Sequence, residues 1–348
     1  MTDYLKLTAY FGERQRSNGR FLADDLLTLY GNSALRTSVM LRGIASFGPR
    51  KELRSDEWLS LSEDPPIAVA AVDTLDKMRG LVDEVVDMTP RGLITLERAS
   101  LTMPGYDAVK LTIYVGRHQR ISDRPAFIAI CDLLYREGVA GASVFLGVDG
   151  TARGQRRRAG FFSPNVDVPV MIISVGDRAN VERVVPQLNS LLPDPLVTVE
   201  RIRVCKRDGQ LLARPDKLPE TDEHGRPLWQ KLMVYTSESA KHDGQPIHRA
   251  LVRRLRSTAA ASGATVLRGI WGFHGTRKPH GDRLFQLSRQ VPVTTIIVDS
   301  PDRIPRSFDI VDELTHDHGL VTSEMVPALI LVDGAERIGG TDLADYRY

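Results

Sequence analysis

The sequence has few of the features that mark secreted, membrane-spanning or redox-active proteins. Only two cysteines, Cys131 and Cys205, occur among 348 residues, too few and too isolated for a disulfide framework or a paired-thiolate metal site. No apolar run approaches the roughly 20 residues that span a bilayer. The N-terminal segment also lacks the apolar core of a signal peptide. These absences predict a soluble, cytoplasmic protein.

Signatures of catalysis and of cofactor binding are missing as well. The chain has no Gly-x-Ser-x-Gly elbow, no Walker loop and no paired-carboxylate pattern. The histidine pairs His274/His280 and His316/His318 are more typical of surface residues than of a metal site. Aromatic residues make up only 6% and are not interleaved with basic ones, so specific nucleic-acid recognition is not expected. We therefore predict no enzyme activity, no cofactor and no metal.

What the sequence does contain is one pattern repeated three times. A Lys-Leu-(Thr/Met)-x-Tyr segment begins at Lys6, Lys110 and Lys231. Each copy closes on a Leu-(Ile/Val)-Thr-x-Glu segment that ends at Glu97, Glu200 and Glu324. The offset between the first and third copies stays between 225 and 227 residues, and coherent offsets indicate tandem duplication. The predicted domains are 1–103, 104–205 and 228–332, with a linker at 206–227 and a C-terminal tail at 333–348.

Each repeat has the periodicity of a β-α-β-β-α-β unit. In the first copy the predicted strands are 5–11, 39–44, 67–72 and 93–99, and the predicted helices are 21–30 and 75–86. This order is typical of the ferredoxin-like, or split β-α-β, arrangement. The third strands, 67–72, 170–175 and 293–298, are apolar on both faces and so need a cover besides their own helices. The sequence thus predicts an α+β protein with three tandem ferredoxin-like domains, packed as a monomeric pseudo-trimer.

The connections between these elements differ in character. The segment 206–227 is rich in charge, proline and glycine and is interpreted as an extended, exposed linker. Long polar loops are expected after each second strand, at 45–57, 151–160 and 271–283. We expect the loops to be mobile, while Phe47, Trp271 and Phe273 anchor their bases against a neighbouring repeat.

With these patterns the chain resembles the PII-like superfamily, and more specifically the family catalogued as domain of unknown function 190. The residues that carry the resemblance in the first copy are Lys6-Leu-Thr-x-Tyr10, Gly12-Glu13-Arg14, Leu41-Arg42-Gly43-Ile44-x-x-Phe47-Gly48, Leu61-Ser62-Glu63-Asp64-x-Pro66 and Leu93-Ile-Thr-x-Glu97. The third copy matches at Leu267-Arg268-Gly269-Ile270-x-x-Phe273, His280, Leu287-Ser288 and Pro292. The resemblance implies a trimer made in one chain, a long T-loop after the second strand, and a small ligand, typically a nucleotide, between neighbouring units. It also implies a protein partner, for which a membrane transporter or channel is one class.

Two loops are expected to meet at the edge of each sheet and to form an anion site. Arginine forks and backbone N–H groups freed by glycine are suited to phosphate or carboxylate. The predicted ligand residues are Gly12, Glu13, Arg14, Arg42, Gly43, Glu238, Arg268 and Gly269. The alternative is purely structural, with glycines that stop strands and solvated arginines. Where the other copies have Leu-Arg-Gly-Ile, the second has Leu146-Gly147-Val148-Asp149-Gly150 without the arginine, so a site that relies on this arginine is not expected there.

The long loops also carry basic residues that suit contact with an acidic partner. These residues are Arg50, Lys51, Arg153, Arg156, Arg157, Arg158, Arg277, Lys278 and His280. A flexible, solvated loop is the alternative. The recurring lysines Lys6, Lys110 and Lys231 either reach a ligand or extend along a sheet edge.

The function predicted from the sequence is that of a non-catalytic, PII-like sensor. It would bind a small anion, typically a nucleotide, between its domains and engage a protein partner through its long loops. The rival hypothesis is an interaction scaffold without a ligand, and an enzyme ranks third.

Overall fold

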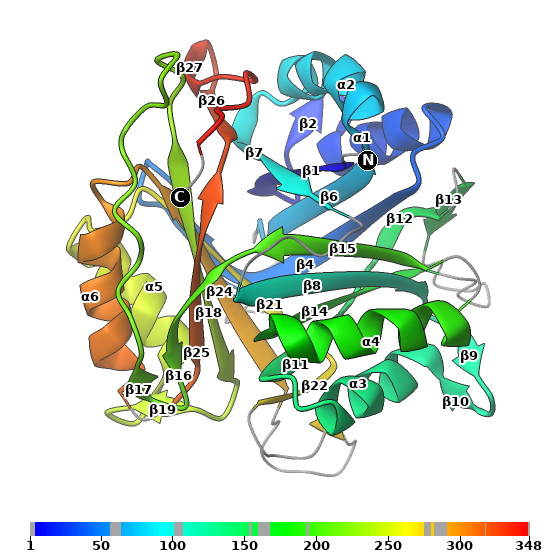
Figure 1. Ribbon diagram of the computed structural model, residues 1–348. Helices are drawn as coiled ribbons and strands as arrows, with labels where there is room; N and C mark the ends of the chain where they lie inside the picture. Colours follow the sequence, from blue (N-terminus) through cyan, green and yellow to red (C-terminus); the bar gives the residue numbers. More distant parts are fainter. Residues whose placement is uncertain are drawn as a thin grey trace.

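The computed structural model describes residues 4–55, 64–100, 107–152, 155–158, 168–192, 195–274, 280–281, 291–316 and 318–346. Among these residues it shows six helices and mostly antiparallel sheets. Helices lie at the periphery in three pairs, and the strands fill the centre (Figure 1). None of the described helices is long and apolar enough to cross a membrane.

The first unit has the predicted β-α-β-β-α-β order. Its strands pair antiparallel in the order β7-β1-β6-β4. The helix α2 turns Met78, Val82 and Val85 to the core, as its spacing of apolar residues predicts. The elements are β1 (Tyr4–Gly12), α1 (Leu22–Asn32), β4 (Thr37–Phe47), β6 (Pro66–Thr74), α2 (Leu75–Met88) and β7 (Arg91–Ala99).

The second and third units repeat this order and this strand pairing. The second consists of β8 (Ala108–Gly116), α3 (Ala126–Arg136), β11 (Gly141–Leu146), β14 (Pro169–Asp177), α4 (Arg178–Leu191) and β15 (Leu196–Arg201). The third consists of β18 (Trp229–Ser237), α5 (Ile247–Ser257), β21 (Ala264–Arg268), β24 (Pro292–Asp299), α6 (Ile304–Leu314) and β25 (Leu320–Val326). Short hairpins link each first strand to its helix, namely β2 (Arg16–Ser17) with β3 (Arg20–Phe21), β9 (Arg120–Ile121) with β10 (Arg124–Pro125), and β19 (Lys241–His242) with β20 (Gln245–Pro246).

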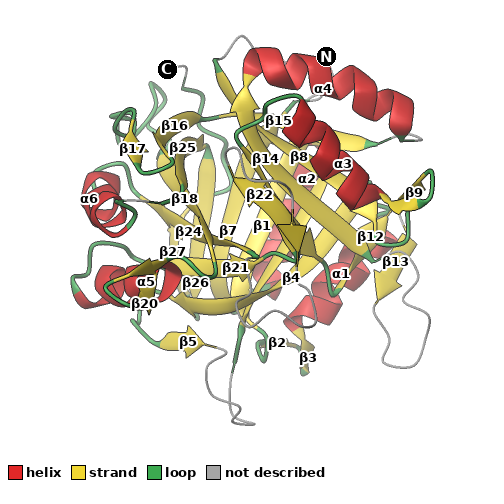
Figure 2. Ribbon diagram, turned by 90° about the horizontal axis from the view of Figure 1, so that it is seen from below, coloured by secondary structure: helices red, strands yellow, loops and turns green. Residues whose placement is uncertain are grey.

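Each sheet is buried on both faces. One face packs on the unit's own two helices and forms that unit's core. The other faces meet in a central apolar cluster to which all three units contribute, including Val39, Phe145 and Met233. Figure 2 shows the pairs α3–α4 and α5–α6 outside this shared interior. The sheets therefore cover one another, as the apolar character of their third strands predicts.

The chain that follows each second strand crosses to a neighbouring unit. The end of β4 pairs with β21 of the third unit. The strand β22 (Trp271–His274) of the third unit pairs with β11 of the second. The strand β12 (Asp149–Ala152) of the second unit pairs with β4 of the first. The first residues of each predicted loop therefore belong to strands, which corrects the prediction that the loops begin directly after the second strands.

Aromatic residues fix these crossings, as the sequence predicts. Phe47 is buried in the core of the third unit. Phe273 is buried in the core of the second unit, and Trp271 packs against the same core. Beyond these anchors the structure describes β5 (Leu53–Ser55), β13 (Gln155–Arg158) and β23 (His280–Gly281).

Glycine is needed where these crossing strands approach a neighbouring backbone. A Cβ atom on Gly43 would lie 2.8 Å from the carbonyl oxygen of Val266 in the third unit. A Cβ atom on Gly269 would lie 2.8 Å from the carbonyl oxygen of Val144 in the second unit. Real side chains do not tolerate such distances to a backbone oxygen. These two glycines therefore have a structural role, independent of any ligand.

A second set of crossings follows the last strand of each unit. Ser100 bridges to Val199 of the second unit. The strand β16 (Arg203–Arg207) pairs with β25 of the third unit and forms a hairpin with β17 (Gln210–Leu211). The strand β26 (Ala328–Asp333) pairs with β7 of the first unit and forms a hairpin with β27 (Glu336–Gly339). In Figure 1 this C-terminal hairpin lies beside β7.

These pairings correct one interpretation made from the sequence. The segment 206–227 is not an exposed connection throughout, because Lys206 belongs to β16 and its ammonium group is buried against Asp312. A segment rich in charge can still complete the sheet of a neighbouring unit. The C-terminal tail 333–348 also packs on the rest of the chain, because it contains β27 and its residues Leu343 and Ala344 are buried.

Candidate functional site

Six charged side chains meet where the three units come together. Each first strand contributes a lysine and each last strand contributes a glutamate, and the two residues are direct cross-strand partners within a unit. No side chain of the six is more than 10% exposed. The members of this ionic ring are Lys6, Glu97, Lys110, Glu200, Lys231 and Glu324.

The ring joins neighbouring units in a closed cycle. Lys6 Nζ lies 2.9 Å from a carboxylate oxygen of Glu97 in its own unit and 2.9 Å from one of Glu200 in the second unit. The other two lysines bridge in the same way, at distances between 2.5 and 3.1 Å. The charges balance, three against three. Buried charges are tolerated only when they are paired in this way.

Mutual attraction outweighs burial at Glu97 and Lys6, whereas at Lys231 burial outweighs the attraction of Glu324 and Glu97 and lowers the pKa of that lysine. Burial disfavours the Glu97 carboxylate, but the ammonium groups of Lys231, Lys6 and Lys110 outweigh it and hold the pKa of Glu97 well below its usual value. Burial likewise opposes the charge on Lys6, yet Glu200 and Glu97 raise the pKa of that lysine. Carboxylate oxygens from the three glutamates lie within 4.8 Å of one another, a spacing that could suit a metal ion. The ammonium groups already supply the positive charge, so the ring is interpreted as a structural hub.

The predicted ligand arginines are paired within their own units. Arg42 forms an ion pair with Glu13, and Arg268 forms the same pair with Glu238. The structure therefore brings together the predicted residues of each unit, but as neutral pairs. Arg117 follows the first strand of the second unit at the position of Glu13.

A third internal carboxylate lies at the predicted anion loop of the first unit. Asp64 accepts a hydrogen bond from the backbone N–H of Arg14 at 2.6 Å and one from Arg54 Nε at 3.2 Å. A Cβ atom on Gly12 would lie 1.9 Å from Asp64 Oδ2, so only glycine leaves room for this carboxylate. The loop does bind an anionic group, and that group belongs to the chain itself.

A cleft of about 210 Å³ lies between the first and third units. One wall comes from the end of β1, the crossing segment after β4 and the start of β7, all in the first unit. The opposite wall comes from β21 and β24 of the third unit, and the C-terminal hairpin contributes a third side. The apolar part of the lining includes Phe11, Leu93, Ile296, Leu331 and Ile338.

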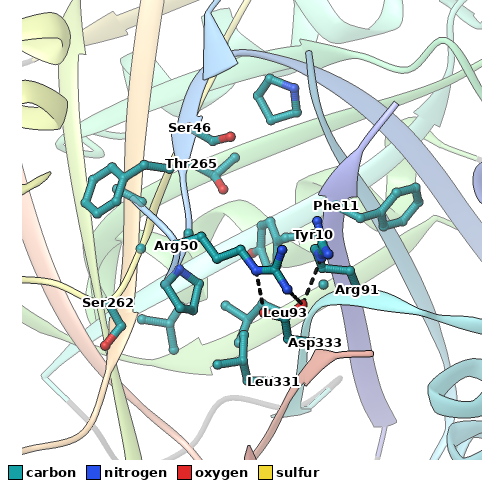
Figure 3. A pocket seen from close by; sticks show the side chains of 18 of the residues that line it. Tyr10, Phe11, Ser46, Arg50, Arg91, Leu93, Ser262, Thr265, Leu331 and Asp333 are labelled. Atoms are coloured by element: carbon teal, nitrogen blue, oxygen red, sulfur yellow. Dashed lines mark hydrogen bonds and ion pairs between the residues drawn. The ribbon is translucent and has the colours of Figure 1, made fainter. Parts of the chain in front are cut away.

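Two arginines of the first unit point to one carboxylate at this cleft (Figure 3). Arg50 donates to Asp333 through Nε at 2.8 Å and through Nη2 at 3.0 Å, and Arg91 donates through Nε at 2.9 Å. Asp333 comes from the end of β26. The hydrogen bonds from Arg50 and Arg91 lower the pKa of Asp333. The arrangement is a bidentate guanidinium–carboxylate contact reinforced by a second guanidinium.

Further polar groups line the same cleft. The indole Nε1 of Trp229 is buried and has no hydrogen-bond partner among the described residues. Ser46, Thr265 and Asp299 also line the cleft. An apolar wall with guanidinium groups at its edge suits an anion that has an apolar or aromatic body.

The basic residues predicted to contact a partner have different placements. Arg50 and Lys51 lie in the turn that joins β4 to β5, and of the two Arg50 lines the cleft between the first and third units. Arg156, Arg157 and Arg158 belong to β13 and His280 to β23, and only their backbone is described. Arg153, Arg277 and Lys278 lie outside the described residues.

Sequence reasoning missed Arg91, Asp333 and Trp229. Arg91 precedes the recurring Leu-Ile-Thr-x-Glu segment, and Asp333 was assigned to a tail. A comparison of the three copies could have pointed to Arg91, because only the first copy has an arginine two residues before this segment, whereas the others have none before Leu196 or Leu320. The pairing of β26 with β7 is what brings Asp333 to Arg91, and no local pattern reveals it.

Comparison with known proteins agrees with the threefold repetition. A model of the family described as uncharacterized ACR, domain of unknown function 190, matches residues 4–101, 108–204 and 229–328. A UPF0166 protein of Aquifex aeolicus is 34% identical over 101 residues, which are 29% of this chain and 92% of the relative. A UPF0166 protein of Methanocaldococcus jannaschii is 33% identical over 90 residues, 26% of this chain and 82% of the relative.

Solved structures give only distant likenesses. A protein of unknown function from Galdieria sulphuraria has a TM-score of 0.18 at 8% identity, covering 63% of this chain and 97% of its own. An anthrone oxidase-like protein has a TM-score of 0.17 at 9% identity, covering 56% and 90%. Scores this low carry no argument. The three family matches together span most of the sequence, and the chain therefore belongs to the family described as domain of unknown function 190, of which it holds three tandem copies.

Proposed function

We propose that this protein is a non-catalytic, PII-like sensor built as a pseudo-trimer of three ferredoxin-like units. It binds a small anion with an apolar or aromatic body, such as a nucleotide, in the cleft between the first and third units. It then engages a protein partner through the segments that follow the second strands, and a membrane transporter or channel is one class of partner that fits such a role.

The observation that carries this proposal is the composition of the cleft. Its walls come from two units, so a bound molecule would contact both of them. Arg50 and Arg91 direct guanidinium groups to one point at its edge. Arg50 also belongs to the segment after β4, so a ligand held by this arginine would touch the segment proposed to meet a partner. Ordering of a segment by a ligand is a common way to switch a contact surface.

The test is calorimetric titration of the full chain with inorganic phosphate, AMP, ADP and ATP. A ligand present at 100 times its Kd stabilises the folded state by about 2.7 kcal/mol, so thermal unfolding is a second readout. The variant Arg91→Gln should weaken binding by about tenfold or more, because a hydrogen bond to a charged group contributes about 1.5–3 kcal/mol.

A matched control is Arg178→Gln, which removes an exposed arginine that pairs with Glu182 on α4. This change should leave anion binding as it is in the unaltered protein. Absence of binding for every anion, or equal binding by Arg91→Gln and the unaltered protein, would remove the cleft as the ligand site.

An interaction scaffold without a ligand is the second candidate. The observation in its favour is the neutral pairing of Glu13 with Arg42 and of Glu238 with Arg268, which leaves those arginines already matched by carboxylates. A partner that binds the full chain equally well with and without nucleotide would favour this reading.

A further inference from the structure

We propose that the C-terminal hairpin carries a built-in competitor, in which the Asp333 carboxylate occupies the position of the ligand's anionic group and is displaced when the ligand binds. The inference rests on the proposed function, because it concerns regulation of the same cleft. The displacing group would be a phosphate or a carboxylate, since both offer two oxygens to a guanidinium fork.

The geometry at Asp333 is that of a bound anion. Both carboxylate oxygens are engaged, Oδ2 by Arg50 and Oδ1 by Arg50 and Arg91. The arginine side chains are 54% and 42% exposed, whereas that of Asp333 is 23% exposed. An incoming anion can therefore reach the guanidinium groups from the solvent side while the carboxylate lies on the protein side.

The hairpin that carries Asp333 is held weakly at its outer strand. All four residues of β27 are exposed, and β27 pairs with β26 alone among the described strands. One exposed ion pair, Arg337 with Asp87 of α2 at 2.9 Å, holds β27 to the first unit. Exposed ion pairs contribute little to stability. Local opening of such a segment requires far less free energy than unfolding of a core strand.

The place of Asp333 belongs to one hairpin only. The hairpin β16–β17 lies against the third unit as β26–β27 lies against the first, but its first strand ends at Arg207, which pairs with Leu320. Leu320 is the counterpart of Leu93, whose partner is Leu331, so β16 ends two residues before the register of Asp333. Only the longer strand β26 brings a side chain to Arg91, and that side chain is a carboxylate matched to the arginines of its own cleft.

The test compares Asp333→Asn with the unaltered full chain in titrations with inorganic phosphate, AMP and citrate. Loss of the competing charge should tighten binding by about tenfold or more, in line with the strength of charged hydrogen bonds. Phosphate and citrate separate a phosphate site from a carboxylate site. The matched control is Asp132→Asn, which removes an ion pair with Arg124 in the second unit, away from the hairpin, and should bind as the unaltered protein does.

Hydrogen exchange of the unaltered protein gives a readout that does not depend on a variant. A displacing anion should speed amide exchange in residues 336–339, while β1 and β6 stay unchanged. If Asp333→Asn and the unaltered protein bound the anions equally well and exchange in the hairpin did not change, Asp333 would not compete with the ligand. The proposal of an anion site in the cleft would then still hold. If neither protein bound any of the anions, the proposed function would fail and the competitor with it.

Discussion

The ionic ring makes a strong prediction about stability. We consider Lys110→Met, which removes one ammonium group and keeps a side chain of similar length. Lys110 Nζ lies 2.6 Å from Glu200 and 2.5 Å from Glu324, and its side chain is 1% exposed. Without this charge, three carboxylates would share two ammonium groups in a site closed to water.

The expected loss in the free energy of unfolding is about 3–5 kcal/mol, the usual result of breaking a buried ion pair by removing one partner. This loss is large against the roughly 5–15 kcal/mol that holds a typical native protein together. The methionine side chain replaces the apolar stem of the lysine, so lost packing should add little.

Urea unfolding followed by circular dichroism measures this loss. The matched control is Lys77→Met, because Lys77 is 37% exposed and pairs with Asp73 at 3.1 Å on the surface. That change should cost at most about 1 kcal/mol. A second variant, Lys110→Met with Glu200→Gln, restores the balance of charge and should recover part of the lost stability.

Two results would refute this reasoning. If Lys110→Met lowered the free energy of unfolding no more than Lys77→Met does, the ionic ring would contribute no more to stability than an exposed ion pair. A double variant as unstable as the sum of its single changes would show that Lys110 and Glu200 do not interact.

The remaining predictions concern a crossing strand, acid stability and the thiols. Gly272→Ala should destabilise the protein, because a Cβ atom at this position would lie 2.2 Å from a carbonyl oxygen of β11. A Cβ atom at Gly80 in α2 would meet nothing within 4 Å, so Gly80→Ala should stabilise the protein by about 0.5–1 kcal/mol. Chemical denaturation measures both changes in the free energy of unfolding. The free energy of unfolding should fall as the pH drops below about 4.3, the pKa of an unperturbed glutamate. The pKa of Glu97 is lowered in the folded state, so protonation of Glu97 at acid pH removes the stability that its charged form contributes. A free energy of unfolding that stays constant below this pH in urea titrations would contradict this prediction. Burial raises the pKa of Cys131, and it raises that of Cys205 to about 12, so both thiols should react with a thiol reagent only after unfolding, which a timed labelling experiment checks.

Periodicity predicted the elements of each unit because local burial dictates them. The alternation before Gly12 and the helical spacing from Leu75 onward reappear as β1 and α2. The apolar third strands also predicted that the sheets would cover one another. These conclusions need only the rule that apolar surface is removed from water, which acts on each segment separately.

Contacts between units could not be predicted in the same way. Lys6 and Glu97 recur in every copy, but whether such a lysine lies at an edge or at the centre depends on strand register and on two neighbouring units. Asp333 meets Arg50 across 283 residues of sequence, through a strand pairing that no local pattern specifies. The apolar third strands predicted that the units pack on one another, but neither they nor the family resemblance could predict contacts that belong to one cleft alone.

Tandem duplication in one chain explains why the centre and the clefts differ in symmetry. In an assembly of identical subunits every interface carries the same residues, and a carboxylate that blocked one cleft would block all of them. In a single chain with three units, each unit can acquire substitutions that the other two lack. The ionic ring keeps the same lysine and glutamate in all three units, because loss of one charge would leave another buried and unpaired. The clefts are under no such constraint, and Arg50, Arg91 and Asp333 meet at only one of the interfaces that the structure describes. One cleft with charged residues of its own among three repeated units is therefore an arrangement that this chain can build and that three separate copies of one unit cannot.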